Sequence, residues 1–170
     1  MRHRKNRLMI TLKPGDGSSL RVTLVNISLP SAATIASQCA RIDPWRRYGV
    51  TAAELQRYLT ALEPAAPRYG LHINDELAGA AGFRMNWLRG PYLQFLAIFP
   101  LYQRRGLGEL VLAWFEGTAI ARGERNLWVA ASAFNADALR FYERHGFRRA
   151  AVLDGLIQDG LSEILLRKVL

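Results

Sequence analysis

The sequence predicts an α+β fold, a mixed and mostly antiparallel sheet flanked by about four helices. Two observations carry this prediction. Apolar runs at 68–73, 77–85 and 91–99 follow one another with short polar turns between them, which is typical of antiparallel neighbours. Later in the chain, segments with helical spacing of apolar residues alternate with strand-like runs, which indicates helices packed on the sheet.

Length and composition limit the class of protein. A chain of 170 residues fits one domain, expected over residues 8–170, and the basic residues 1–7 are expected to form a disordered tail. No apolar run approaches the roughly 18 residues of a membrane span, and no secretory signal is seen, so we expect a cytoplasmic protein without a membrane partner. The single Cys39 excludes a disulfide framework and a multi-cysteine metal site, and we expect no metal and a buried, inert thiol.

The chain carries 23 basic and 14 acidic residues, a net charge of +9. Such an excess fits a nucleic-acid partner, a phosphate-bearing ligand, or a basic solvated surface. The basic residues are mostly scattered, and no stripe of them alternates with aromatic residues. The pattern therefore disfavours a nucleic-acid partner.

The N-terminal part predicts two strands and then a helix. Runs 8–12 and 20–25 flank a Pro-Gly-Asp-Gly turn, so either they form a hairpin or only the second run joins the sheet. The helix is expected to begin near Pro30 and to carry Ile35 and Cys39 inward. It is expected to end before the Asp-Pro pair at 43–44, because a residue that precedes proline is disfavoured in the α region.

A second helix is predicted by the capping box formed by Thr51 and Glu54. Its apolar face is expected to include Leu55 and Leu62, and Pro64 is expected to end it.

The stretch 96–108 reads as the end of a strand, a glycine-containing turn and the start of a helix. An apolar run stops at Pro100, and the segment Gln-Arg-Arg-Gly-Leu-Gly at 103–108 then opens a helix. The first N–H groups of a helix lack partners and carry partial positive charge, and glycines let a ligand approach the backbone. This junction is therefore a candidate phosphate site. The segment does not match a Walker A loop, because Glu109 follows Gly108 where that motif needs lysine. It does not match the dinucleotide-binding fingerprint either, because the third glycine of that motif is missing.

The rest of the chain continues the alternation of helix and strand. The helix that starts at 107 is expected to bury one face and to end at Gly123. Its expected buried face comprises Leu107, Leu110, Val111, Trp114 and Thr118 or Ala119. Strands are expected at 126–130, 147–153 and 162–169, and Asn135 is a plausible N-cap for a helix between the first two.

Two runs, 98–108 and 135–147, carry the most specific signal. The first is I-F-P-L-Y-Q-R-R-G-L-G, which resembles the acetyl-CoA motif V-x-P-x-x-Q/R-x-x-G-x-G/A of the GNAT superfamily of N-acetyltransferases. The second is N-A-D-A-L-R-F-Y-E-R-H-G-F, which resembles the family's N-x-x-A-x-x-F/L-Y-x-x-x-G-F segment. The resemblance implies a GNAT-like fold in which the strands at 91–99 and 126–130 splay apart and acetyl-CoA enters between them.

The resemblance also implies which residues contact acetyl-CoA. They are the strand backbone before Pro100, the turn at the helix start, and two residues of the second motif. The expected coenzyme-binding residues are Leu96, Ala97, Ile98, Gln103, Arg104, Arg105, Gly106, Leu107, Gly108, Asn135 and Tyr142. Ile98 N–H is the expected oxyanion donor. Asn135 either contacts the coenzyme or only caps its helix.

Tyr142 is the candidate general acid, because a leaving thiolate needs a proton and a phenol can supply one. The alternative for Tyr142 is a core aromatic residue that hydrogen-bonds the backbone. The general base is missing where some relatives carry a glutamate, since 127–132 contains no carboxylate. A water relay through Gln94 or Asp43, or an amine that arrives partly neutral, is the expected substitute.

The implied activity is transfer of an acetyl group from acetyl-CoA to a primary amine by direct attack in a ternary complex. The expected acceptor is a small-molecule amine or a peptide N-terminus, and a homodimer is possible. The expected acceptor residues are Trp45, Tyr48, Gln94 and Trp128, with Trp87 and Tyr92 nearby. The missing carboxylate motivates an alternative, a non-catalytic module of the same fold that binds CoA or a partner.

Overall fold

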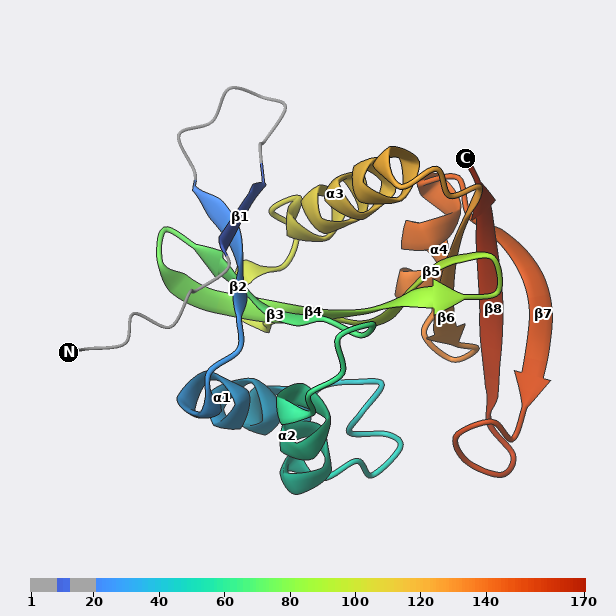
Figure 1. Cartoon of the computed structure of the whole chain (residues 1–170). Coiled ribbons are helices and arrows are strands. Elements are labelled where there is room, and N and C mark those ends of the chain that lie inside the picture. Colours follow the sequence, from blue (N-terminus) through green and yellow to red (C-terminus); the bar gives the residue numbers. More distant parts are fainter. Residues whose placement is uncertain (1–8, 13–20) are drawn as a thin grey trace.

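A computed structural model describes residues 9–12 and 21–170 (Figure 1). Its strands are β1 (Met9–Leu12), β2 (Val22–Asn26), β3 (Arg68–Ile73), β4 (Glu76–Trp87), β5 (Gly90–Ile98), β6 (Asn126–Ser132), β7 (Arg148–Asp154) and β8 (Ser162–Val169). Its helices are α1 (Leu29–Cys39), α2 (Ala52–Thr60), α3 (Leu107–Ala121) and α4 (Ala136–Arg144), with a short 3-10 turn, η1 (Pro100–Tyr102). The disordered tail predicted for 1–7 and the turn predicted for 14–17 lie outside the described residues.

The described strands form one sheet in the order β1-β2-β3-β4-β5-β6-β8-β7. Every neighbouring pair is antiparallel except β5 and β6, which are parallel, so the predicted mixed and mostly antiparallel sheet is confirmed. Because β1 and β2 pair along their length, both N-terminal runs belong to the sheet.

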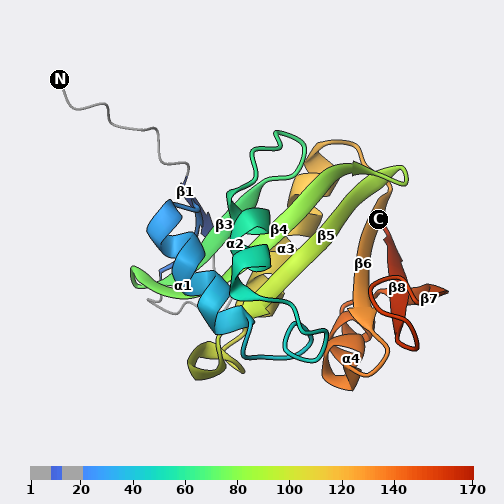
Figure 2. The ribbon, with the colours of Figure 1, turned by 90° about the horizontal axis from the view of Figure 1, so that it is seen from below.

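The four helices cover both faces of the sheet. Helices α1 and α2 lie on one face and α3 lies on the other, as the two views in Figures 1 and 2 show. Each face has its own buried core. The α1–α2 core includes Ile35, Cys39, Leu55, Leu59 and Phe95. The core on the opposite face combines side chains of α3 and α4 with those of the central strands, such as Phe83, Phe115, Leu127 and Tyr142.

Local signals set the helix ends where the sequence predicts them. Thr51 Oγ1 accepts from Glu54 N at 3.2 Å and Glu54 Oε2 accepts from Thr51 N at 2.8 Å, so the capping box forms. Asn135 Oδ1 accepts from Ala138 N at 3.2 Å and caps α4. Gly123 follows α3 with a φ of +73°, the left-handed conformation that a C′ glycine supplies.

Two details of helix packing differ from the prediction. Leu62 is 98% exposed, because α2 ends at Thr60 and helical spacing no longer applies beyond it. Helix α3 turns a different stripe inward than predicted. Its buried residues are Leu107, Val111, Leu112, Phe115 and Ala119, whereas Leu110, Trp114 and Thr118 are half-buried. The Phe115 ring lies 5.0 Å from the Phe83 ring over the middle of the sheet, which sets this rotation of the helix.

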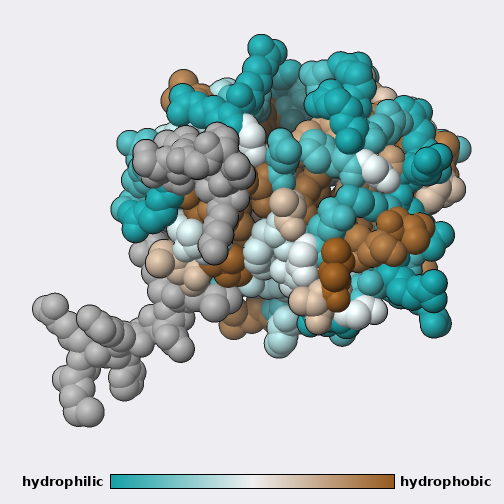
Figure 3. All heavy atoms as spheres, turned by 90° about the horizontal axis from the view of Figure 1, so that it is seen from above, coloured by the Kyte–Doolittle hydropathy of each residue, from teal (hydrophilic) through white to brown (hydrophobic). Residues whose placement is uncertain are grey.

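The face seen in Figure 3 is predominantly hydrophilic, with hydrophobic atoms in smaller groups between the polar side chains. None of the helices in the described residues combines the length and hydrophobicity that crossing a bilayer requires.

Candidate active site

The central strands separate just where the sheet changes from antiparallel to parallel. Strands β5 and β6 pair only at Tyr92 with Trp128 and at Leu93 with Val129. The register between β4 and β5 shifts by one residue at this point, so Gln94 forms a β-bulge. Consequently the Leu93 side chain belongs to the core on the α3 face of the sheet, whereas that of Phe95, two residues later, belongs to the α1–α2 core on the other face. Since a bulge bends its strand and often ends pairing, the bulge explains why β5 leaves β6 here.

Beyond the bulge, β5 keeps hydrogen bonds to β4 but presents a free edge to the gap. Phe99 N–H donates to Ala78 O at 2.8 Å, toward β4. Because backbone groups alternate along a strand, the N–H groups of Ile98 and Leu96 face the gap and that of Ala97 faces β4. Ile98 O also faces the gap, where it accepts a hydrogen bond of 2.9 Å from Gln103 Nε2.

The turn after η1 opens α3 toward the same gap. Arg104 and Gly106 adopt left-handed φ angles of +61° and +74°, and α3 begins at Leu107. The first bond of the helix ladder runs from Leu110 N to Gly106 O, so the preceding N–H groups have no intrahelical acceptor. Such a helix start, with partial positive charge and no side chain on Gly106, fits a phosphate.

A groove of about 720 Å³ runs from this turn along the separated strands to α4. Leu96, Ala97 and Ile98 line one wall, and the turn from Gln103 to Gly108 lines one end, except for Arg105. Arg105 instead lies with its guanidinium 5.6 Å from the Tyr102 ring centroid.

Charged side chains of both signs line the groove. Arg104, Arg140, Arg144 and His145 line it, together with the carboxylates of Asp43, Glu109 and Asp137. Asp137 pairs with Arg140, whereas Arg104 and Arg144 form no ion pair within the described residues. Two unpaired guanidinium groups therefore add to the charge of the helix start.

A second, smaller cavity of about 170 Å³ adjoins the groove where β5 and β6 diverge. Both cavities are lined by Pro44, Trp45, Leu96, Asn135, Ala138 and Tyr142. The small cavity continues between the loop after α1 and the start of β8. One long groove and one small pocket thus meet at the free edge of β5.

Comparisons with known proteins agree with this geometry. A family model described as the Acetyltransferase (GNAT) family matches residues 30–147. The chain belongs to the GNAT family of acetyltransferases. Its predicted class is confirmed: it is an N-acetyltransferase that takes its acetyl group from acetyl-CoA.

Individual relatives support the same family. The [ribosomal protein bS18]-alanine N-acetyltransferase of Escherichia coli K12 is 32% identical over 135 residues, which cover 79% of this chain and 82% of the relative. An acetyltransferase structure from Thermus thermophilus superposes with a TM-score of 0.72 at 21% identity, covering 88% of this chain and 97% of that one. A GNAT structure from Elizabethkingia anophelis with acetyl-CoA bound gives a TM-score of 0.62 at 16% identity, covering 98% of this chain and all of that one. These solved structures confirm the fold.

Tyr142 lies where the two cavities of this acetyltransferase meet. Its side chain is 7% exposed, and its hydroxyl has no hydrogen-bond partner among the described residues. The sequence left open a core tyrosine that bonds the backbone, and the structure shows no such bond. Burial, and to a smaller extent the nearby Tyr92 phenol, raise the pKa of Tyr142 well above its usual value, so the phenol keeps its proton.

Three of the four acceptor residues predicted for this acetyltransferase line the small pocket. They are Trp45, Tyr48 and Gln94, and Tyr92 lines it too. The structure does not bring Trp128 to either cavity. Its indole N–H donates to Leu88 O at 3.0 Å, and its ring packs edge-on against Trp87 at 5.5 Å. Trp128 lies where β5 and β6 still pair, before the gap opens.

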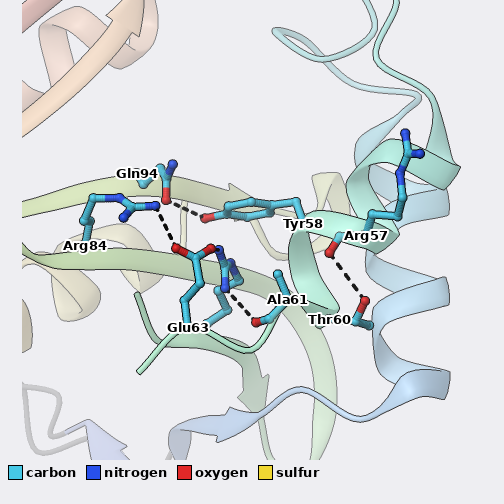
Figure 4. A network of polar contacts seen from close by, with 8 residues as sticks. Arg57, Tyr58, Thr60, Ala61, Glu63, Arg84 and Gln94 are labelled. Carbon is cyan, nitrogen blue, oxygen red and sulfur yellow. Dashed lines mark hydrogen bonds and ion pairs between the residues drawn. The ribbon is translucent and has the colours of Figure 1, made fainter. Parts of the chain in front are cut away.

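A polar network fixes the Gln94 side of the pocket (Figure 4). Tyr58 of α2 donates to Gln94 Oε1 at 3.4 Å, and the Arg68 guanidinium lies 4.4 Å from the Tyr58 ring centroid. Arg68 and Arg84 both bind Glu63, at 2.6 and 3.1 Å. These two guanidinium groups lower the pKa of Glu63. The Gln94 side chain is therefore positioned by Tyr58 and by the charged groups around it, none of which lines the pocket.

Asp43, the other predicted relay residue, does not line the small pocket. It lines the large groove, and Arg46 Nε donates to its carboxylate at 3.1 Å.

Two polar pocket residues escaped the sequence analysis, Ser132 and Glu163. Ser132 ends β6 and Glu163 is the second residue of β8, and the two are direct partners in the antiparallel register. Glu163 is 6% exposed and accepts a hydrogen bond from the Tyr48 hydroxyl. Burial, with the Glu163 carboxylate beside it, raises the pKa of Tyr48 to about 12. Nothing local in the sequence pairs these residues, since 115 positions separate Tyr48 from Glu163.

Proposed function

We propose that this acetyltransferase transfers the acetyl group directly to the α-amine of a peptide N-terminus, within a ternary complex. The observation that carries the proposal is the junction of the two cavities at Leu96, Asn135 and Tyr142. A groove for the coenzyme on one side and a separate pocket on the other allow both substrates to be present together. Direct attack then needs no acetylated enzyme intermediate.

The residues of the groove suit acetyl-CoA, which supplies the activated acetyl group. The free N–H groups at the start of α3, with Arg104, are the proposed phosphate site. Ile98 N–H, which faces the gap, is the proposed oxyanion donor, and one such donor contributes about 2.7–4 kcal/mol in related chemistry. Tyr142 is the proposed general acid, because its hydroxyl lies at the junction with no protein acceptor among the described residues.

The size of the pocket supports a small end group on the acceptor. A cavity of about 150 Å³ holds a benzene molecule, and this pocket measures about 170 Å³. The first residue of a peptide with a short side chain fits such a volume, and the rest of the peptide leaves through the open side. The relative that is 32% identical acts on the alanine of a ribosomal protein, which agrees with a small first residue.

The structure removes the reason for the alternative, a non-catalytic module that binds CoA or a partner. It rested on the absence of a carboxylate from 127–132, and Glu163 of β8 places one directly across from Ser132. The cytoplasmic location and the possible homodimer stay predictions.

Release of the free CoA thiol tests this function. Acetyl-CoA is offered with short peptides that begin with Ala, Ser or Trp, and with small amines such as glycine and spermidine. We expect the Ala and Ser peptides to be modified fastest, at the α-amine by mass spectrometry, and an N-terminally blocked peptide that contains lysine to be inert. Initial rates at varied concentrations of both substrates should give intersecting double-reciprocal lines. Parallel lines, or faster turnover of the small amines than of the peptides, would contradict the proposal.

A further inference from the structure

The small pocket contains a buried carboxylate whose charge is not balanced. Glutamate is almost never fully buried unless it is paired, since removing its charge from water is costly. Glu163 is 6% exposed, yet among the described residues it forms no ion pair and its one hydrogen-bond partner is the neutral hydroxyl of Tyr48. An ionised carboxylate offers about four acceptor positions, so most of its capacity is unused. The complement of such a group is a cation with several N–H donors.

A second unused acceptor lies in the same pocket. Ser132 is 2% exposed, and its Oγ has no hydrogen bond of normal geometry within the described residues, although it lies near enough to the Tyr48 phenol to lower the pKa of that phenol slightly. Buried polar atoms in proteins are nearly always satisfied, so an unsatisfied hydroxyl that lines a cavity marks a place for a ligand atom. Ser132 and Glu163 are register partners, so both face one point beside the free edge of β5.

The loop after α1 holds this site from the other side. The ring centroids of Tyr48 and Phe134 lie 5.4 Å apart, and the Arg47 guanidinium lies 4.2 Å from the Phe134 centroid. This packing orients the Tyr48 hydroxyl toward Glu163. Tyr48 is therefore a positioning residue, because it fixes the carboxylate without needing to touch the acceptor.

We propose that Glu163 is the general base for the acceptor amine and that Ser132 Oγ helps to bind the same nitrogen. This inference rests on the proposed function and names the base that the reaction there lacks. Strand β6 supplies no carboxylate at 127–132, and its neighbour β8 supplies one instead. The acceptor class that follows is a protonated primary amine rather than an alcohol or a thiol, since a buried anion favours a cation.

Protons and electron pairs balance in this reaction. Glu163 takes one proton from the ammonium group, and the nitrogen lone pair then forms the C–N bond to the acetyl carbon. As the C–S bond breaks, the sulfur receives a proton from the Tyr142 hydroxyl. The nitrogen loses its second proton as the amide forms, and this proton restores Tyr142 through solvent. Glu163 releases its proton to water at the pocket mouth, so the net products are the amide, the free thiol and one proton.

The groups that face Glu163 come from four elements. Tyr48 comes from the loop after α1 and Tyr92 from β5, and the charge of Glu163 helps to raise the pKa of both. Ser132 comes from β6 and is not titratable near neutral pH. From β7, the apolar side chain of Leu153 shares the face of its register partner Glu163, whereas Asp154 pairs with Ser162 on the other face and accepts from its hydroxyl at 2.6 Å. Arg47 is the cation that acts on Tyr48.

The test is the pH dependence of kcat/KM for an Ala-initiated peptide in Glu163→Gln. An α-amine has a pKa of about 7.7–8.0, so it is mostly charged at pH 7 and mostly neutral at pH 9. We expect Glu163→Gln to lose at least about 100-fold at pH 7, the usual effect of a general base, and to recover much of the loss at pH 9. The dissociation constant of acetyl-CoA should be unchanged. Asp159→Asn removes an exposed carboxylate from the same β7–β8 connection and should behave as the wild type.

Several outcomes overturn the inference. A Glu163→Gln enzyme as active as the wild type removes the role, and so does a defect of equal size at every pH. If Glu163→Gln does not fold, Tyr48→Phe decides. Tyr48→Phe removes the hydroxyl that orients the carboxylate, so kcat/KM for the Ala-initiated peptide should fall at pH 7 and recover at pH 9. A Tyr48→Phe enzyme as active as the wild type at pH 7 contradicts the proposal. A wild type that binds acetyl-CoA but modifies no amine refutes the proposed function itself, which is a different result from an active wild type with an active Glu163→Gln.

Discussion

The side-chain amide of Gln103 donates a hydrogen bond of 2.9 Å to the backbone carbonyl of Ile98. This bond ties the turn that opens α3 to the free edge of β5. The proposed phosphate site and the proposed oxyanion donor are therefore fixed relative to one another by a single side chain. The relationship explains why a glutamine at the start of the Gln-Arg-Arg-Gly-Leu-Gly turn has a structural role besides contacting a ligand.

Gln103→Ala tests this tie. Removal of one hydrogen bond of about 0.5–1.5 kcal/mol should weaken acetyl-CoA binding by about 2- to 12-fold, because the turn loses its register with β5. Isothermal titration with acetyl-CoA measures the change. Gln56→Ala, at a half-buried site on α2 away from both cavities, is the matched control and should bind as the wild type does. Equal affinities for both variants would show that the tie does not position the site.

Ligand-induced stabilisation tests the groove as a whole. A ligand that binds only the folded state raises Tm in proportion to the logarithm of its concentration over its Kd. Acetyl-CoA should raise Tm, and NAD and ATP at equal concentration should raise it less, because the turn lacks a Walker A lysine and a third glycine. Thermal unfolding with each ligand measures this order. A larger shift with ATP than with acetyl-CoA would refute the phosphate-site assignment.

Gly106 and Gly117 form a pair that separates backbone strain from crowding. A Cβ atom at either position meets no atom within 4 Å, but Gly106 has a φ of +74° and Gly117 is helical. Gly106→Ala should therefore cost about 1–2 kcal/mol of folding free energy and weaken acetyl-CoA binding. Gly117→Ala should stabilise by about 0.5–1 kcal/mol without affecting binding. Denaturant unfolding and titration measure both, and equal effects at the two sites would contradict the argument.

The parts of the fold that follow local rules were predictable from the sequence. The Thr51–Glu54 capping box, the Asn135 cap and the left-handed Gly123 all depend on a few neighbouring residues. The strand predicted at 68–73 is found with the same bounds. The turn that opens α3 was predictable too, because glycines between an apolar run and a helical pattern indicate a strand-to-helix turn.

The acceptor pocket was less predictable, because it depends on pairings between distant segments. The bulge at Gln94 reverses the faces of β5, and no neighbouring residue of β5 is a glycine or proline, although Gly82 lies opposite it on β4. Glu163 reaches the pocket only because β8 inserts between β6 and β7, a choice of neighbour that a single sequence does not determine. Trp128 was misplaced because it and the next residue, Val129, still pair with β5, and the gap opens only beyond them.

Cys39 should be unreactive in the native protein. It is fully buried in the α1–α2 core, and burial raises the pKa of its thiol to about 12. The reactive thiolate is therefore nearly absent at pH 8, and reagents cannot reach it. We expect negligible alkylation by iodoacetamide in the folded protein and stoichiometric alkylation in guanidinium chloride, measured by mass spectrometry. Rapid stoichiometric labelling at pH 8 without denaturant would contradict this burial.

Tyr142→Phe tests the proposed acid most directly. The substitution keeps the ring and removes only the hydroxyl, which has no protein partner among the described residues. If this hydroxyl protonates the departing thiolate, kcat should fall by about 10²–10⁴-fold, the usual effect of a general acid. The Kd of acetyl-CoA should hold, because phosphate binding depends on the start of α3. Steady-state rates with an Ala-initiated peptide, titration and thermal unfolding on one preparation measure all three quantities.

Tyr69 provides the matched control for that substitution. It is as buried as Tyr142, in the same core, but it lines neither cavity, so Tyr69→Phe should leave kcat unchanged. The Tm of Tyr142→Phe should also stay close to that of the wild type, because no intramolecular hydrogen bond is lost. A stability loss of about 0.5–1.5 kcal/mol with normal turnover would instead show that the hydroxyl bonds within the protein. In that case solvent, rather than Tyr142, protonates the thiolate.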